Sequence, residues 1–251
     1  MNIEEIKRTL VTKPLPQHIG IILDGNGRWA TKRMLPRIKG HEKGVKTLRE
    51  IVLEVKELKI PYLTVFAFST ENWNRPQGEV DFLMNQVKKY YYNYFNKLLE
   101  QKIKVRFIGF KERIPQDVLI IMEEIEQKTK EFNGFTLTIA FNYGSTKEIV
   151  EACRKIATDV AKQKITISNI DESLFENYLF TKDLQPLDFI IRTSGEMRLS
   201  NFMLYQAAYA EMYFPKTLWP DFHKKELYIA LLEYQSRNRR FGGLNKWRKE
   251  W

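Results

Sequence analysis

Short apolar runs recur along the chain and are separated by longer stretches in which apolar residues return every three or four positions. Several of the short runs are apolar almost throughout, which is typical of strands buried on both faces of a parallel sheet. The pattern predicts six strands, over residues 18–23, 62–68, 104–110, 135–141, 187–191 and 211–214.

The longer stretches have the spacing of amphipathic helices. Val45, Leu48, Val52 and Val55 form one apolar stripe, and a second stripe runs over residues 80–98. Further helices are predicted over residues 115–130, 147–161, 171–179, 201–210 and 221–237, together with a short one at the amino terminus that ends before Pro14.

The alternation of strands and helices defines the fold class. It predicts an α/β domain with right-handed crossovers and a mostly parallel six-stranded sheet surrounded by helices on both faces. No repeat, linker or low-complexity segment interrupts the alternation. We therefore expect one domain over residues 1–251, with an N-terminal helix within about residues 1–16 and a basic tail at about 244–251.

The composition narrows the class of protein. Hydrophobic residues make up 43% of the 251 residues, which is ample for a packed core. Cys153 is the single cysteine, which excludes an intramolecular disulfide and a multi-cysteine metal site. No apolar run approaches the roughly 18 residues of a membrane helix, and the acidic amino terminus is unlike a secretory signal. A cytoplasmic globular protein is expected.

The formal net charge of +10 is concentrated in two segments. Residues 28–49 contain eight basic residues and one acidic residue, and residues 237–250 contain six basic residues and one acidic residue. Basic segments on a nearly neutral body indicate an anionic ligand, such as phosphate, nucleic acid or a membrane surface. A solvated helix face and a basic tail are the alternative interpretation.

In sheets of this kind ligands bind beyond the carboxyl ends of the strands. The first predicted strand is followed by the segment Asp24-Gly-Asn-Gly-Arg-Trp29. Its glycines allow a close approach of the backbone to a ligand, and the N–H groups that open a helix can bind phosphate. A carboxylate beside a phosphate site is a natural Mg²⁺ ligand. An ordinary Asp-Gly-Asn-Gly turn is the alternative interpretation of this spacing.

Two more polar segments follow predicted strands. Residues 69–76 are dense in hydrogen-bond donors, and residues 192–201 contain two arginines and two serines that suit a diphosphate. Glu211 is a candidate second metal carboxylate or a solvated residue at a strand start. His41 lies in the basic segment, and none of the three histidines has the spacing of a zinc site.

At these residues the chain resembles the cis-prenyltransferases, and among them the bacterial undecaprenyl diphosphate synthases. The similarity runs from about His18 to Gly243. The chain contains no Asp-Asp pair, whereas the unrelated trans-prenyltransferases rely on aspartate-rich Mg²⁺ motifs. The motifs are Asp24-Gly-Asn-Gly-Arg-Trp29, Gly40-His41, Phe68-Ser-Thr-Glu-Asn-Trp-Asn-Arg-Pro76, Asn142-Tyr-Gly144, Arg192-Thr193, Arg198-Leu-Ser-Asn-Phe202, Trp219-Pro-Asp-Phe222 and Arg239-Arg-Phe-Gly-Gly243.

The resemblance implies catalytic roles for Asp24 and Asn72, and a Mg²⁺ held by Asp24 and Glu211. Asp24 would assist departure of the allylic diphosphate. The family assigns proton acceptance to the position of Asn72, but an amide is a very weak base, so a substrate diphosphate oxygen positioned by Asn72 is the better acceptor. The implied substrate-binding residues are Gly25, Asn26, Gly27, Arg28, Trp29, Arg37, His41, Ser69, Thr70, Glu71, Trp73, Arg75, Arg192, Arg198, Leu199 and Ser200.

The resemblance further implies a hydrophobic cleft between the sheet and the helices carrying residues 41–58 and 80–99. The product chain would lie in this cleft. The aromatic cluster of Tyr90, Tyr91, Tyr92, Tyr94 and Phe95 would then lie along it, unless these side chains are plain core packing.

The implied reaction adds isopentenyl diphosphate units in cis to farnesyl diphosphate. The implied product is undecaprenyl diphosphate, the precursor of the bacterial cell-wall lipid carrier, and it would pass to the membrane. The enzyme would be a homodimer that is cytoplasmic or peripheral at the membrane. Residues 239–243 would reach the partner's site. A different product length, a non-catalytic partner subunit and a nucleic-acid-binding protein are the alternatives.

Two observations bear on these alternatives. Retention of Asp24, Arg28, Asn72, Arg198 and Ser200 argues against a non-catalytic subunit. The aromatic residues fall mostly at core-like positions, which argues against a surface that stacks on nucleic acid. We therefore expect no nucleic-acid partner.

Overall fold

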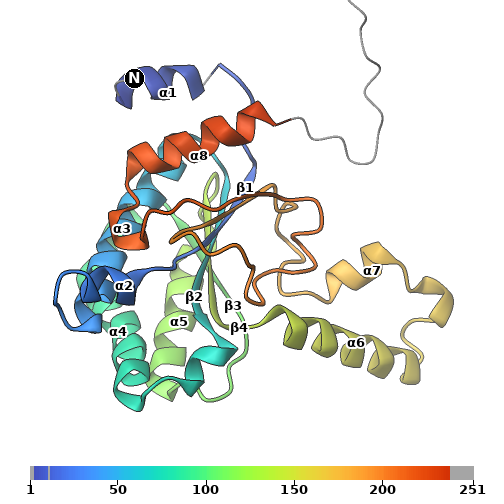
Figure 1. Cartoon of the computed structure of the whole chain (residues 1–251). Helices are drawn as coiled ribbons and strands as arrows, with labels where there is room; N and C mark the ends of the chain where they lie inside the picture. Colours follow the sequence, from blue (N-terminus) through green and yellow to red (C-terminus); the bar gives the residue numbers. More distant parts are fainter. Residues whose placement is uncertain (1–2, 11, 238–251) are drawn as a thin grey trace, which may run out of the picture.

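The computed structural model describes residues 3–10 and 12–237 (Figure 1). The predicted basic tail and residues 239–243 lie outside the described residues. A six-stranded sheet forms the centre of the molecule, in the order β3-β4-β2-β1-β5-β6, and every pairing is parallel. The strands are β1 (His18–Ile22), β2 (Tyr62–Ser69), β3 (Lys104–Ile108), β4 (Thr136–Tyr143), β5 (Phe189–Arg192) and β6 (Glu211–Tyr213). All six predicted strands are confirmed.

The register places the functional segments at one edge of the sheet. Ile19 of β1 lies opposite Leu63 of β2 and Phe189 of β5, and Ile22 lies opposite Arg192. The strands therefore end at similar levels, and the segments that follow β1, β2 and β5 emerge side by side. This edge is where an open parallel sheet binds ligands.

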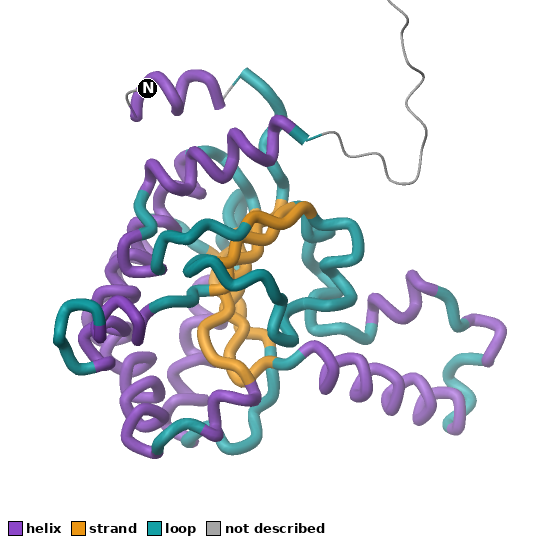
Figure 2. The backbone as a smooth tube through the Cα atoms, viewed as in Figure 1, coloured by secondary structure: helices purple, strands orange, loops and turns teal. Residues whose placement is uncertain are grey.

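The helices are arranged unevenly around the sheet. The α-helices are α1 (Ile3–Leu10), α2 (Asn26–Thr31), α3 (Arg37–Glu57), α4 (Gln77–Glu100), α5 (Gln116–Thr129), α6 (Ser145–Ala161), α7 (Glu172–Asn177) and α8 (Lys224–Ser236). Three 3₁₀ turns are η1 (Thr70–Asn74), η2 (Ile167–Asn169) and η3 (Trp219–Asp221). Helices α3, α4, α5 and α8 pack against the sheet, whereas α6 and α7 extend away from it (Figures 1 and 2).

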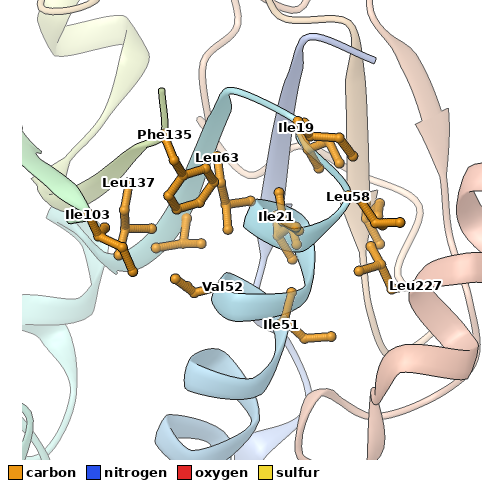
Figure 3. Packing of buried hydrophobic residues seen from close by; sticks show 14 of the residues in the cluster. Ile19, Ile21, Ile51, Val52, Leu58, Leu63, Ile103, Phe135, Leu137 and Leu227 are labelled. Atoms are coloured by element: carbon orange, nitrogen blue, oxygen red, sulfur yellow. The ribbon is translucent and has the colours of Figure 1, made fainter. Parts of the chain in front are cut away.

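The main core lies between the sheet and these four helices. Ile21 and Leu63 project from the strands toward Ile51 and Val52 of α3, and Leu227 of α8 closes the same cluster (Figure 3). Alternate strand residues reach this face because side chains alternate along a strand. Burial of this apolar surface is the main source of the fold's stability.

The second face of the sheet corrects one prediction. The helix predicted over residues 201–210 does not form, and an irregular segment covers this face instead. Ser200, Asn201 and Met203 have φ values of 48°, 65° and 47°, which an α-helix cannot contain. Phe202 is nevertheless fully buried and stacks on Phe66 at 4.8 Å between ring centroids. The spacing of apolar residues in segment 201–210 therefore reflects burial against the sheet and not a helix.

His18 makes the fold sensitive to acid. Its side chain is 1% exposed, with Nδ1 2.8 Å from the Gln185 carbonyl oxygen and Nε2 2.7 Å from Thr64 Oγ1. Burial lowers the pKa of His18 below its ordinary value of 6.5. As the pH falls through 6.5, the unfolded chain takes up a proton that the folded chain does not, so the free energy of unfolding decreases.

We expect the melting temperature to fall as the pH is lowered below 6.5, and to fall less steeply in a His18→Gln variant. Burial also lowers the pKa of His41, so part of the slope should remain in that variant. Melting curves recorded across this pH range measure both slopes. Parallel losses in the two proteins would show that His18 is not responsible.

Candidate active site

Asp24 is held firmly just beyond the end of β1. Its backbone oxygen accepts hydrogen bonds from Thr193 Oγ1 at 2.6 Å and from the Trp219 N–H at 3.0 Å. Its carboxylate pairs with Arg192 at 2.9 Å and with Arg28 at 3.3 Å. Burial alone would raise the pKa of Asp24, but these two guanidinium groups outweigh it and lower the pKa. Asp24 is therefore a fixed, ionised carboxylate.

The glycines of the predicted motifs allow close packing at this edge. Gly25 has a φ of 111°, and a Cβ there would lie 3.0 Å from the Leu218 side chain. A Cβ at Gly40 would lie 1.9 Å from the backbone oxygen of Asn26, and one at Gly44 would lie 2.2 Å from Asn26 Oδ1. Only glycine lets α3 approach the turn after β1 this closely.

Glu196 links two of the arginines that the resemblance implied as substrate-binding residues. Arg28 pairs with one of its carboxylate oxygens at 2.9 Å, and Arg198 pairs with the other. The attraction to Arg198 is the largest cause of the lowered pKa of Glu196. Glu196 was not among the predicted site residues, although it lies within the polar segment 192–201.

Glu79 links a second group of basic side chains. Its carboxylate pairs with Arg75 at 2.8 Å, with Arg37 at 3.4 Å and with His41 at 3.4 Å. A Cβ at Gly27 would lie 2.7 Å from Cζ of the Arg37 guanidinium, so glycine leaves room for this side chain. Glu79 is thus the shared partner of two arginines and of His41, whose pKa is lowered by burial. Glu79 was not among the predicted site residues either.

The segment after β2 forms η1 and presents Asn72 to the site. Asn72 Oδ1 accepts a hydrogen bond from the Ser69 N–H at 3.1 Å, which leaves Asn72 Nδ2 to act as a donor. The Trp73 indole N–H donates to Asn142 Oδ1 at 2.7 Å and anchors the other side of η1. This arrangement suits Asn72 to hold an anion rather than to accept a proton.

A cavity of about 770 Å³ opens at this edge and extends between the sheet and helices α3 and α4. Its inner wall is apolar and includes Leu48, Val52, Leu98, Ile125 and Leu137. The predicted hydrophobic cleft is therefore confirmed. Among the five aromatic residues expected along the cleft, Tyr90 lines the cavity, whereas Tyr92 is 76% exposed. A polar mouth joined to an apolar interior suits an amphiphilic ligand.

The mouth contains polar atoms that are not satisfied by the protein. Asn26 Oδ1 and Arg192 Nε are buried and have no hydrogen-bond partner among the described residues, and buried His41 Nε2 has only the 3.4 Å contact with Glu79. Buried polar groups normally have partners, because leaving one unpaired costs roughly 1–3 kcal/mol. These three atoms therefore indicate a polar ligand at the mouth of the cavity.

Most of the predicted site residues meet at this mouth. Those that line the cavity are Asp24, Asn26, His41, Ser69, Glu71, Asn72, Arg75, Arg192, Arg198 and Ser200. Those in the turn and the ion pairs around it are Gly25, Gly27, Arg28 and Arg37.

Four predicted substrate-binding residues lie beside the cavity without lining it. The Trp29 indole donates to Asp221 at 2.7 Å, and the Trp73 indole donates to Asn142. Thr70 packs next to Gly144, and Leu199 packs against the core of the second sheet face.

Glu211 does not join Asp24 in a metal site within this chain. It opens β6 opposite Phe189, which is level with Ile19, five residues before Asp24. At about 3.3 Å per residue this separates the two residues by roughly 16 Å along the strands. Glu211 Oε2 instead accepts a hydrogen bond from Arg237 at 2.9 Å. The predicted strand over residues 211–214 already began at Glu211, and the parallel register places this strand start at the edge of the sheet opposite Asp24.

Fold and site together define an enzyme that handles an anionic head group and a long apolar chain. The model of the undecaprenyl diphosphate synthase family (Prenyltransf) matches residues 22–242. The chain is 51% identical to the isoprenyl transferase of Thermotoga maritima over 92% of its own length and 98% of that protein. It is 47% identical to the isoprenyl transferase of Bacillus subtilis, covering 95% of this chain and 92% of that protein. The chain belongs to this family and is a prenyltransferase.

Solved structures show the same relationship. The chain matches lavandulyl diphosphate synthase of Lavandula x intermedia, crystallised with dimethylallyl diphosphate, with a TM-score of 0.88, 37% identity and coverage of 91% of this chain and 98% of that one. It matches a Campylobacter jejuni protein, described as a probable undecaprenyl diphosphate synthase, with a TM-score of 0.74, 31% identity and coverage of 91% and 99%.

Across residues 3–10 and 12–237, no helix combines the length and apolarity that a membrane span needs.

Proposed function

We propose that this enzyme condenses isopentenyl diphosphate units in cis onto farnesyl diphosphate and releases undecaprenyl diphosphate. The observation that supports the proposal best is the continuity of the cavity. A mouth lined by Asp24, Arg192 and Arg198 leads directly into an apolar interior, within a volume of about 770 Å³. A diphosphate would bind at the mouth while a prenyl chain fills the interior.

The two diphosphates would bind on either side of Asp24. The allylic diphosphate fits the turn at Gly25, the cations Arg28 and Arg37 and the His41 ring, where it would replace Glu79 as the counterion of Arg37. Isopentenyl diphosphate fits the other side. There Arg192, which is 4% exposed, donates to Ser200 Oγ at 2.7 Å and to the backbone oxygen of Arg198.

The proposed cofactor is Mg²⁺. Within the described residues there is no cluster of three or more His, Cys, Asp or Glu side chains suited to a metal ion. Asp24 alone still fits, because Mg²⁺ is commonly held by one or two carboxylates together with substrate phosphates and water. When bound there it would neutralise negative charge on the leaving diphosphate.

The residues of the chain would act mainly by stabilising charge. Cleavage of the allylic carbon–oxygen bond builds charge on the diphosphate, which Arg28 and the N–H groups of the turn would stabilise. The dry cavity would protect the cationic carbon from water. Asn72 would donate from Nδ2 to a diphosphate oxygen and so orient the oxygen that removes the proton from the isopentenyl unit.

An Arg198→Ala variant tests the assignment of the isopentenyl site. Arg198 lies on the exposed side of the mouth, where its side chain pairs with Glu196 and its backbone oxygen accepts from Arg192. Loss of one charge-assisted hydrogen bond should raise the KM for isopentenyl diphosphate about tenfold to a hundredfold. Steady-state incorporation of labelled isopentenyl diphosphate measures this. An unchanged KM would place isopentenyl diphosphate elsewhere.

Assembly and release belong to the same proposal. The enzyme would act as a homodimer in the cytoplasm and pass its product to a membrane, since a long prenyl chain is poorly soluble in water. Farnesyl diphosphate and isopentenyl diphosphate are its proposed partners. Light scattering of the full chain tests the dimer, and a monomeric, fully active protein would contradict it.

A further inference from the structure

Asn201 joins three segments of the site through one residue. It ends the polar segment after β5 and has a φ of 65°, which asparagine tolerates better than most residues. Its backbone oxygen accepts from the Ser145 N–H at 2.9 Å, and its Oδ1 accepts from the Thr146 N–H at 2.8 Å. Its Nδ2 donates to Glu71 Oε1 at 2.9 Å.

The packing around Gly144 shows how closely these segments meet. Gly144 has a φ of −156°, which any residue adopts, so its backbone conformation does not require glycine. A Cβ there would lie 2.6 Å from Thr70 Oγ1 and 2.9 Å from Asn201 Nδ2. Glycine is required because η1 and the segment after β5 are pressed together at the start of α6.

The residues next to this junction lie at the reacting centre. Ser200, directly before Asn201, accepts from Arg192 in the isopentenyl diphosphate site. Asn72, directly after Glu71, lines the same cavity. Partial burial would raise the pKa of Glu71, but the hydrogen bond from Asn201 is the largest of the contacts that together lower it. Glu71 therefore accepts from Asn201 as a carboxylate.

We propose that Asn201 is a positioning residue that fixes η1 against the isopentenyl diphosphate site. The inference rests on the proposed function. Through the Asn201–Glu71 hydrogen bond, the loop that binds isopentenyl diphosphate at Ser200 also sets the position of Asn72. When a diphosphate orders the loop at Ser200, it therefore also orders Asn72. Asn72 in turn orients the diphosphate oxygen that accepts the proton. Asn201 itself need not touch either substrate.

The test is a double-mutant cycle between Asn201 and Glu71. Asn201→Asp keeps the acceptor for Thr146 but turns a carboxylate oxygen toward Glu71, and Glu71→Gln supplies a donor in return. We expect Asn201→Asp to lower kcat about tenfold or more in the wild-type background, with the KM for farnesyl diphosphate and the melting temperature nearly unchanged. In the Glu71→Gln background the same substitution should lower kcat less than about threefold.

Asn201→Gly is the matched variant, because it keeps the backbone conformation and introduces no charge. It should also lower kcat in the wild-type background and have little effect in the Glu71→Gln background. It keeps the cycle decisive if the aspartate variant folds poorly. A role confined to the start of α6 would leave Asn201→Asp active and make Asn201→Gly unstable, which would overturn the proposal.

Equal losses in both backgrounds would overturn the proposal as well, because they would show that Asn201 does not act through Glu71. The wild-type enzyme keeps the two proposals separate. If it fails to elongate farnesyl diphosphate, the proposed function is wrong. If it elongates farnesyl diphosphate but the cycle is additive, only the role of Asn201 is wrong.

Discussion

Replacing Asp24 with alanine is expected to lower kcat by several orders of magnitude while the protein stays folded. The carboxylate lies in a glycine turn at the mouth of the cavity, so its removal opens no void in the core. Leaving-group stabilisation acts mainly in the transition state, and the loss should therefore appear in kcat more than in KM. Single-turnover and steady-state kinetics measure it.

Asp24→Asn is the matched variant for this experiment. It keeps the shape of the side chain and an acceptor for Arg192, which otherwise loses its carboxylate partner. Both variants should melt cooperatively and lack turnover. Near-wild-type kcat in either one would show that the Asp24 charge has no part in the departure of the diphosphate.

Val52→Phe is expected to shorten the product by one or more isoprene units. Val52 lies on α3 (Figure 3). It is 4% exposed and lines the apolar interior of the cavity, where an added ring would occupy the space proposed for the growing chain. Because the ring fills a cavity instead of a packed core, stability should change little. Chromatography of the labelled products measures their length.

Val55→Phe is the control, one turn further along α3. Val55 is 0% exposed and belongs to the same hydrophobic core, but it does not line the cavity. Here the added ring has no room, and overpacking should cost roughly 1–3 kcal/mol of the free energy of unfolding. Unchanged product length in Val52→Phe would mean that the chain does not grow along this wall.

The sequence predicted the strands and the cleft because both depend on local patterns. Each apolar run became a strand, and the stripe of Val45, Leu48 and Val52 on α3 faces the sheet and the cavity. The polar segments after β1, β2 and β5 meet because parallel strands end at a common edge. That rule holds for any such sheet and needs no knowledge of the register.

What the sequence could not show depends on contacts between distant residues. Glu79 is recognisable as a counterion only when α4 is placed beside Arg37 and His41. The predicted strand over residues 211–214 already began at Glu211, but the separation of Glu211 from Asp24 follows from its register with Phe189. In residues 201–210, apolar spacing mimicked a helix because burial against an irregular segment gives a similar pattern.

The measurement that tests the account most directly is product analysis after incubating the enzyme with farnesyl diphosphate, labelled isopentenyl diphosphate and Mg²⁺. The account predicts labelled polyprenyl diphosphate of undecaprenyl length, with every newly formed double bond in the cis configuration. Absence of any elongated product, or elongation with trans double bonds, would contradict it.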